Sequence, residues 1–324
     1  MFPIKNNWQG RLAIIGVILA VVVVAALGWF KKSVSEKEVQ ALDLAIPVYP
    51  YPVKKTFALS PVLTARSVVV LDKNSAVPLY VKNPNETLLP ASTVKIMTAL
   101  VVLDYFDMQQ ILTVGFLNDV GQQLKLNSGE RLSVEELLKA LLIYSANDAA
   151  QVLAQNYPGG EIDFVAAMNQ KALDLGLKQT YFANPTGLDS DEQNRLLTDH
   201  SYTTAVDLAQ LTRAALKNEF FRQIVATQKT TISNLDGQTR LVENLNQLLG
   251  HVRGVMGVKT GWTQDAGECL VTNIERDGHE IVITLLGSQN RFAETSQLVE
   301  WVYSNFTWQK AVPAISDQLP VGRQ

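Results

Sequence analysis

The longest uncharged stretch of the chain runs from Leu12 to Phe30. At about 1.5 Å per residue it would cross most of a hydrocarbon core of roughly 30 Å, which predicts a transmembrane helix over residues 12–30. A tryptophan stands near each end of this stretch, Trp8 and Trp29, as is typical of membrane interfaces. A cleaved signal peptide is the alternative, but the stretch exceeds the roughly 7 to 15 apolar residues of such peptides. An uncleaved anchor is therefore favoured.

Residues 31–61 follow with no sustained hydrophobic period and with several prolines, which predicts an extended stalk. The pattern divides the rest of the chain into a globular domain over 62–308 and a flexible tail over 309–324. Residues 1–11 would then form a short cytoplasmic segment. The prolines of the stalk are Pro47, Pro50, Pro52 and Pro61.

The globular domain shows strand patterns at both ends and helical patterns between them. Two β-branched runs, 66–71 and 77–81, flank a turn-forming segment and are expected to pair as a hairpin. Asp277-Gly278 predicts a second hairpin turn. Helices are expected at 92–103, 133–142, 148–155, 161–175, 204–216 and 292–303, and strands at 230–232, 240–242, 254–258, 269–274 and 280–286. This order predicts an α+β fold, with an antiparallel sheet flanked by helices.

Composition narrows the classes of function. The net charge is −3 with no basic block, so nucleic acid is not an expected partner. The three histidines show no metal-ligand spacing, and we expect neither a metal site nor a cofactor. The single cysteine, Cys269, lies in an apolar run and is interpreted as a small buried hydrophobe.

Lys95 is a charge at the mouth of an otherwise apolar helix that continues through Leu103. In one interpretation its long stem carries the ammonium to solvent. In the other, Ser92 and Lys95 lie one helical turn apart on the same face, so the amine contacts the hydroxyl. Burial would lower the pKa of that amine, and the free amine could then take the serine proton.

Two further motifs carry candidate chemistry. Ser145-Ala146-Asn147 lies where one predicted helix ends and the next begins, although a serine there could also be a simple helix cap. Lys259-Thr260-Gly261 lies at the end of an apolar strand, where it could equally begin a turn. Each motif alone is a weak signal.

Ser-x-x-Lys, Ser-x-Asn and Lys-Thr-Gly in this order are the motif set of penicillin-binding proteins and class A β-lactamases. The chain resembles the serine DD-peptidases of the low-molecular-weight penicillin-binding protein type, the D-alanyl-D-alanine carboxypeptidase family. Asn184-Pro185-Thr186-Gly187-Leu188-Asp189 and the residues around the three motifs are also similar, and the resemblance covers about 62–308. It implies the β-lactamase/DD-peptidase fold, with an all-helical subdomain beside the sheet.

The resemblance also implies roles for individual residues. Ser92 would be the nucleophile, Lys95 the general base, and Ser145 a hydroxyl that relays protons. Asn147 would hold the substrate's backbone amide, and Lys259 would keep Lys95 neutral and attract the terminal carboxylate.

On the same strand, Thr260 would offer that carboxylate a hydroxyl, followed by Gly261. The backbone N–H groups of Ser92 and Trp262 would form the oxyanion hole. Arg291 corresponds to a carboxylate-binding arginine of some family members, or else is a surface arginine in the first turn of the last helix.

The expected activity is a penicillin-sensitive D-Ala-D-Ala carboxypeptidase that acts on peptidoglycan stem peptides, with β-lactams as covalent inhibitors. Three alternatives stay open: an endopeptidase that cleaves cross-links, a β-lactamase, and a non-catalytic wall-binding domain. A class A β-lactamase would carry Glu-x-x-x-Asn in the loop that contains Glu192, whereas Leu196 stands at the asparagine position. A peptidoglycan substrate places the domain outside a bacterial cell membrane that the N-terminal helix crosses once.

Overall fold

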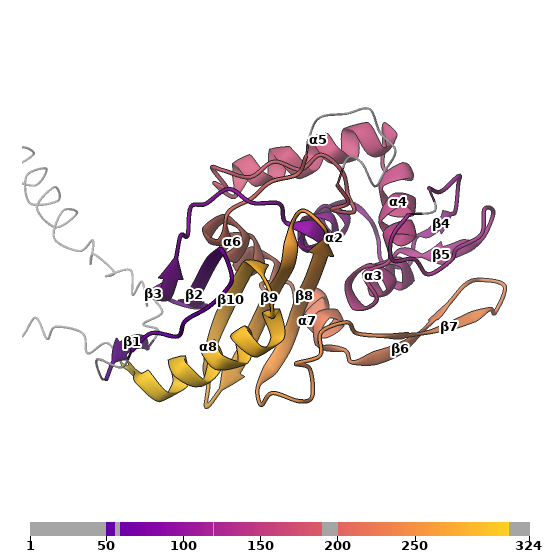
Figure 1. Ribbon diagram of the computed structural model, residues 1–324. Coiled ribbons are helices and arrows are strands. Elements are labelled where there is room, and N and C mark those ends of the chain that lie inside the picture. The colour runs from indigo at the N-terminus through magenta and orange to yellow at the C-terminus, as the bar shows by residue number, and fades with distance from the viewer. Residues whose placement is uncertain (1–49, 56–58, 119, 190–199, 311–324) are drawn as a thin grey trace, which may run out of the picture. The chain divides into compact units, whose positions relative to one another are not determined.

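The computed structural model describes residues 50–55, 59–118, 120–189 and 200–310. The centre of the folded domain is a five-stranded antiparallel sheet in the order β3-β2-β10-β9-β8 (Figure 1). Its strands are β2 (Ser67–Asp72), β3 (Pro78–Lys82), β8 (Val255–Thr263), β9 (Gly267–Arg276) and β10 (His279–Ser288). Strand β8 forms one edge, and it carries the Lys-Thr-Gly motif along its length instead of in a turn.

Both faces of the sheet are buried. Successive residues of a strand point to opposite faces, so a strand that is apolar at every position contributes to a hydrophobic core on each side. Val68 and Val70 of β2 belong to one apolar core, and Val69 and Leu71 belong to the other. The two hydrophobic layers require helices on both sides of the sheet.

Helices cover both faces (Figure 1). The C-terminal helix α8 packs on one face against β9 and β10, whereas α6 packs on the other against β2 and β10. Helix α2 packs against α3, α5 and α6, and α3 and α4 continue this helical group beyond the β8 edge. The bounds are α2 (Lys95–Tyr105), preceded by the 3₁₀ turn η1 (Ala91–Val94), α3 (Val134–Ile143), α4 (Asn147–Gln155), α5 (Gly160–Asp174), α6 (Ala205–Ala215), α7 (Glu219–Ala226) and α8 (Arg291–Asn305).

Four of these helices begin at a residue whose side chain accepts a backbone N–H of the first turn, which satisfies one of the donors left free at a helix start. The four residues are Ser133, Thr204, Asn218 and Asn290. These caps explain why the helical patterns of the sequence begin where they do.

Three short antiparallel pairs complete the described fold: β1 (Tyr51–Lys54) with β11 (Phe306–Gln309), β4 (Ile111–Thr113) with β5 (Arg131–Ser133), and β6 (Lys229–Ser233) with β7 (Thr239–Glu243). Strand β1 falls inside the segment predicted to be a stalk, and it pairs with the residues that follow α8. The folded domain therefore begins before the predicted boundary at residue 62.

The predicted α+β class with an antiparallel sheet and flanking helices is confirmed. The sequence pattern missed α7, because a helix of eight residues contains only about two turns in which the helical period can show. It also missed the three-residue strands β4 and β5. The predicted span over 12–30 lies outside the described residues. Within the part that is described, no helix is both long and apolar enough to cross a bilayer.

Candidate active site

Ser92 and Lys95 meet where η1 passes into α2. Lys95 is completely buried, and its Nζ lies 2.9 Å from Ser92 Oγ. The same Nζ lies 2.7 Å from Asn147 Oδ1 and 2.7 Å from the carbonyl oxygen of Thr186. An amide oxygen and a carbonyl oxygen can only accept hydrogen bonds. In a neutral amine these two partners take both N–H groups, so the lone pair is left for the Ser92 hydroxyl.

The surroundings of Lys95 favour that neutral form. Burial lowers the pKa of Lys95 well below its usual value, and the nearby charge of Lys259 lowers it further. The carboxylate of Asp148 acts in the opposite direction on the pKa. The interpretation that Lys95 reaches solvent is therefore wrong, because its side chain has no exposed surface.

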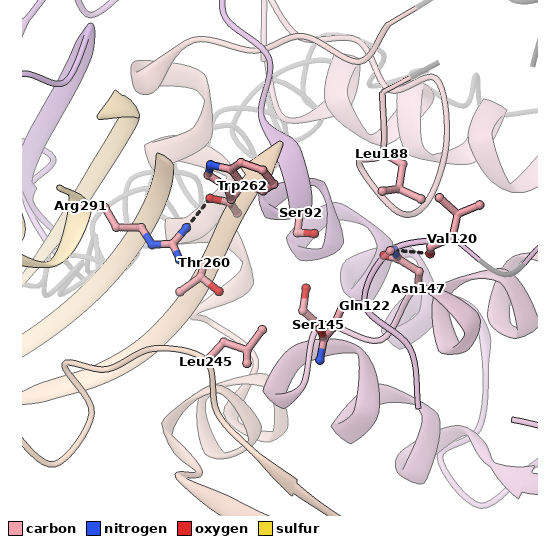
Figure 2. Close-up of a pocket in the computed structure, with 12 residues that line it drawn as sticks. Ser92, Val120, Gln122, Ser145, Asn147, Leu188, Leu245, Thr260, Trp262 and Arg291 are labelled. Carbon is pink, nitrogen blue, oxygen red and sulfur yellow. Dashed lines mark hydrogen bonds between the residues drawn. The ribbon is translucent and has the colours of Figure 1, made fainter. Parts of the chain in front are cut away.

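Ser145 lies between α3 and α4, and Asn147 is the first residue of α4. Ser145 has a positive φ of 63° and is buried, and Figure 2 shows its hydroxyl directed into the pocket. It is not the helix cap of the alternative interpretation, because Ala146 occupies that position. Asn147 Nδ2 donates to the carbonyl of Val120 at 3.0 Å. No hydrogen bond joins Ser145 Oγ to either lysine of the site in the described part of the chain, so its relay role stays a prediction.

Strand β8 brings the third motif to the same place. Lys259 is buried and donates to the carbonyl of Thr260 at 3.0 Å. Burial, and then the charge of Arg291, lower the pKa of Lys259 to about 7. Thr260 is buried at the pocket wall, whereas the side chain of Trp262 is 62% exposed at the pocket rim.

Gly261 allows β8 to approach η1 closely. A Cβ at this position would lie 3.0 Å from Ser92 N and 3.1 Å from Ala91 Cβ. Only a residue without a side chain permits this separation unless one of the two elements moves. The glycine of the motif thus brings the edge strand beside the backbone N–H of the nucleophile.

Arg291 is the first residue of α8 and also lines the pocket, so binding of a carboxylate by this residue stays a prediction. Its Nη1 donates to the carbonyl of Gly261 at 2.6 Å (Figure 2). Its backbone N–H donates to Glu268 Oε2 at 2.7 Å. Among the described residues, the buried Nε atom of Arg291 has no hydrogen-bond partner.

The loop 184–188 supplies a contact to Lys95 that the sequence patterns did not reveal. Asn184 Oδ1 accepts the backbone N–H groups of Thr186 and Gly187 at 3.1 and 2.7 Å, which folds the loop tightly. Thr98 Oγ1 of α2 donates to the carbonyl of Pro185 at 2.7 Å. These bonds aim the Thr186 carbonyl at Lys95. The Asn-Pro-Thr-Gly run was a signal of similarity, but no side chain in it indicated a backbone contact.

A substitution at Gly187 tests the close packing of the loop 184–188 against η1. Its φ is +79°, and a Cβ there would lie 2.1 Å from the carbonyl oxygen of Ala91. We expect Gly187→Ala to lower the free energy of unfolding by about 3 kcal/mol or more and to slow acylation of Ser92. Urea denaturation and penicillin labelling would measure the two effects.

Gly237 provides a matched control, because its φ is +80° and nothing lies within 4 Å of a Cβ there. Gly237→Ala should cost only the roughly 1 to 2 kcal/mol of a left-handed backbone. Equal losses in the two variants would contradict the role given to the contact between Gly187 and Ala91.

These elements enclose a pocket of about 430 Å³ (Figure 2). Six other predicted site residues reach its walls together with Ser92, whereas Lys95 and Lys259 are buried and do not line it. The sequence did not reveal the wall residues Val120, Gly121, Gln122, Leu188 and Leu245. They come from loops whose positions depend on tertiary contacts. The predicted residues on the walls are Ser92, Ser145, Asn147, Thr260, Gly261, Trp262 and Arg291.

The chain matches the family model of the D-alanyl-D-alanine carboxypeptidases, peptidase family S11, over residues 54–290. The chain belongs to this family. It is therefore a serine peptidase, and Ser92, Lys95, Ser145, Asn147 and Lys259 stand at the positions of the family motifs. Glu192, which raised the β-lactamase alternative, lies outside the described residues.

Among relatives in the family, D-alanyl-D-alanine carboxypeptidase DacF of Bacillus subtilis is 33% identical over 75% of this chain and 63% of its own length. A D-alanyl-D-alanine endopeptidase of Pseudomonas aeruginosa is 34% identical over 78% of this chain and 81% of its own length. The crystal structure of a D-alanyl-D-alanine carboxypeptidase from Mycobacterium tuberculosis superposes with a TM-score of 0.71 at 30% identity, covering 80% of this chain and 98% of that one.

Proposed function

We propose that the protein is a D-Ala-D-Ala carboxypeptidase that removes the terminal D-alanine of peptidoglycan stem peptides and is acylated by β-lactams. One observation carries the proposal: the buried Nζ of Lys95 lies 2.9 Å from Ser92 Oγ, and its other two hydrogen bonds go to the acceptor oxygens of Asn147 and Thr186. This geometry supports Lys95 as the general base and Ser92 as the nucleophile.

The reaction follows from these contacts. Ser92 Oγ attacks the carbonyl carbon of the penultimate D-alanine while its proton passes to Lys95 Nζ. The oxyanion is stabilised by the backbone N–H groups of Ser92 and Trp262, which the close approach at Gly261 brings together. Ser145, whose hydroxyl faces the pocket, gives its proton to the departing amine and takes in its place the proton that Lys95 received from Ser92. Water then hydrolyses the acyl-ester on Ser92 and restores the serine hydroxyl.

Positive groups lie on the side of the pocket that would receive the leaving D-alanine. Thr260 offers a hydroxyl and Arg291 a guanidinium, with Lys259 buried behind them. The guanidinium of Arg291 lines the pocket, and a guanidinium suits a carboxylate acceptor. These groups support a substrate that ends in a free carboxylate.

A pentapeptide ending in D-Ala-D-Ala tests the proposal directly. We expect the purified domain to release D-alanine and to be labelled covalently by a fluorescent penicillin. Hydrolysis of penicillin without release of D-alanine would instead indicate a β-lactamase. Failure of both reactions would indicate a binding domain without turnover.

Cleavage of cross-links is the second candidate activity, because the Pseudomonas aeruginosa endopeptidase is among the relatives. Purified cross-linked muropeptides, supplied beside the pentapeptide, distinguish the two activities. Faster cleavage of the dimers than of the pentapeptide would favour an endopeptidase over a carboxypeptidase.

Removal of the Arg291 charge should weaken selection for a free carboxylate. We expect Arg291→Gln to raise KM for the pentapeptide by roughly 10- to 100-fold, because a hydrogen bond to a charged group contributes about 1.5 to 3 kcal/mol. For a peptide with a C-terminal amide, the same substitution should raise KM far less. Arg253→Gln is the matched control, since Arg253 forms an exposed ion pair with Asp277. Equal losses for the acid and the amide would contradict this role of Arg291.

We also propose that residues 12–30 anchor the protein in a bacterial cell membrane with the catalytic domain outside. The length and apolar character of this stretch support the anchor, and a peptidoglycan substrate supports the orientation. Protease added to intact spheroplasts should then digest the domain. Full protection of the domain would contradict the orientation, and recovery of the whole protein in the soluble fraction would contradict the anchor.

A further inference from the structure

Asp148 is a buried carboxylate beside the site with no role in the reaction described above. It lies in the first turn of α4 and is 1% exposed. Its Oδ1 accepts the backbone N–H groups of Leu124 and Ala149 at 3.1 and 2.9 Å, and its Oδ2 accepts that of Leu126 at 3.1 Å. A buried carboxylate is costly unless it is bonded in this way.

The bonds to Leu124 and Leu126 hold the segment that forms one wall of the pocket. Asn147 binds the same segment a few residues earlier: its backbone N–H donates to the Gln122 carbonyl at 2.7 Å, and its Nδ2 donates to the Val120 carbonyl at 3.0 Å. The first two residues of α4 therefore hold this wall by hydrogen bonds, and Asp148 is the charged one of the two.

Asp148 also acts on the general base. The residue before Asp148, Asn147, contacts Lys95 directly, with its Oδ1 at 2.7 Å from Lys95 Nζ, and the neutral carbonyl of Thr186 is a second contact at 2.7 Å. The charged groups that act on Lys95 are the carboxylate of Asp148 on α4 and the ammonium of Lys259 on β8. The charge of Lys259 favours the neutral amine, whereas the charge of Asp148 favours the ammonium. A base that is too weakly basic accepts a proton poorly in the transition state, so the two opposing charges tune its strength.

We propose that Asp148 is a positioning residue of this active site, whose carboxylate anchors the wall at Leu124 and Leu126 and offsets the charge of Lys259 at Lys95. The inference rests on the proposed acylation of Ser92 by way of Lys95. It predicts that one substitution changes both the pocket wall and the pH dependence of acylation.

The second-order rate constant for acylation by penicillin, measured against pH, tests this inference in the wild type and in Asp148→Asn. The variant keeps an acceptor oxygen and loses the charge, so the acid limb of its profile should move to lower pH. One pH unit below the wild-type midpoint, the variant should retain a severalfold larger fraction of its own maximal rate.

Gln151→Ala is the matched control, because Gln151 Oε1 accepts the N–H of Asn118 at 2.9 Å in the same wall without a charge. This variant should change the rate but leave the acid limb in place. An unmoved limb in Asp148→Asn, or the same shift in both variants, would overturn the inference. Absence of acylation in the wild type would instead overturn the proposed function.

Amide hydrogen exchange keeps the inference testable if Asp148→Asn does not fold. In the wild type the amides of Leu124 and Leu126 should exchange slowly, because both donate to the buried carboxylate. Exchange of these two amides as fast as in an open loop would overturn the anchoring role.

Discussion

Ser92→Ala should abolish covalent labelling by fluorescent penicillin and should lower the release of D-alanine by about 10⁴-fold or more, on the scale of the loss of an active-site serine in other peptidases. The physical reason is that Ser92 Oγ is the hydroxyl placed against the lone pair of Lys95 at 2.9 Å. Alanine leaves the base in place with no hydroxyl to deprotonate. Gel fluorescence of the labelled protein and an assay for free D-alanine measure the two losses.

The matched control is Ser304→Ala. Ser304 is exposed and lies near the C-terminal end of α8, whereas the pocket is at the N-terminal end of this helix. This variant should be labelled and should turn over substrate as the wild type does. Thermal unfolding of both variants checks that each remains folded. Labelling of Ser92→Ala at the wild-type level would refute the assignment of the nucleophile.

Lys95→Met is expected to slow acylation by roughly 10³-fold or more, because a positioned general base contributes about 10² to 10⁴ in rate. Methionine fills a similar volume and cannot accept the serine proton. The rate of penicillin acylation in stopped flow measures the loss. Lys229→Met is the control, since Lys229 forms an exposed ion pair with Glu243 at the end of the β6–β7 hairpin.

Lys95→Met should also change the stability of the fold and its dependence on pH. The pKa of Lys95 is well below its usual value in the folded protein, so the unfolded chain binds a proton that the native state does not. The stability of the wild type therefore rises with pH towards the usual pKa of lysine, and at neutral pH the buried amine is destabilising. We expect Lys95→Met to unfold at higher urea than the wild type at pH 7, and the difference should shrink at pH 9.

In the wild type, the rate of acylation should fall as the pH is lowered through the pKa of Lys95, because protonation removes the lone pair. A wild-type rate that stays constant across the acid range, or a Lys95→Met variant that is acylated normally, would rule out Lys95 as the base. Ser145 would then be the hydroxyl to examine, since it also faces the pocket.

Local patterns predicted most of the regular elements. The β-branched composition of two runs on either side of a turn-forming segment predicted the pairing of β2 with β3, and Asp277-Gly278 predicted the turn between β9 and β10. These features depend on residues close in the chain, so the sequence contains them directly. Elements of three or four residues, such as β1 and β4, have too few positions to show a period.

The sequence by itself determined the three motifs, their order and the family, and it placed Ser92 and Lys95 one turn apart. Only the tertiary structure decided that Lys95 is buried, that the carbonyl of Thr186 is its third partner, and that the charges of Asp148 and Lys259 act on its pKa in opposite directions. The physical reason is that burial and backbone contacts arise between segments far apart in the chain. The proton affinity of an amine depends on those contacts and not on its neighbours in sequence.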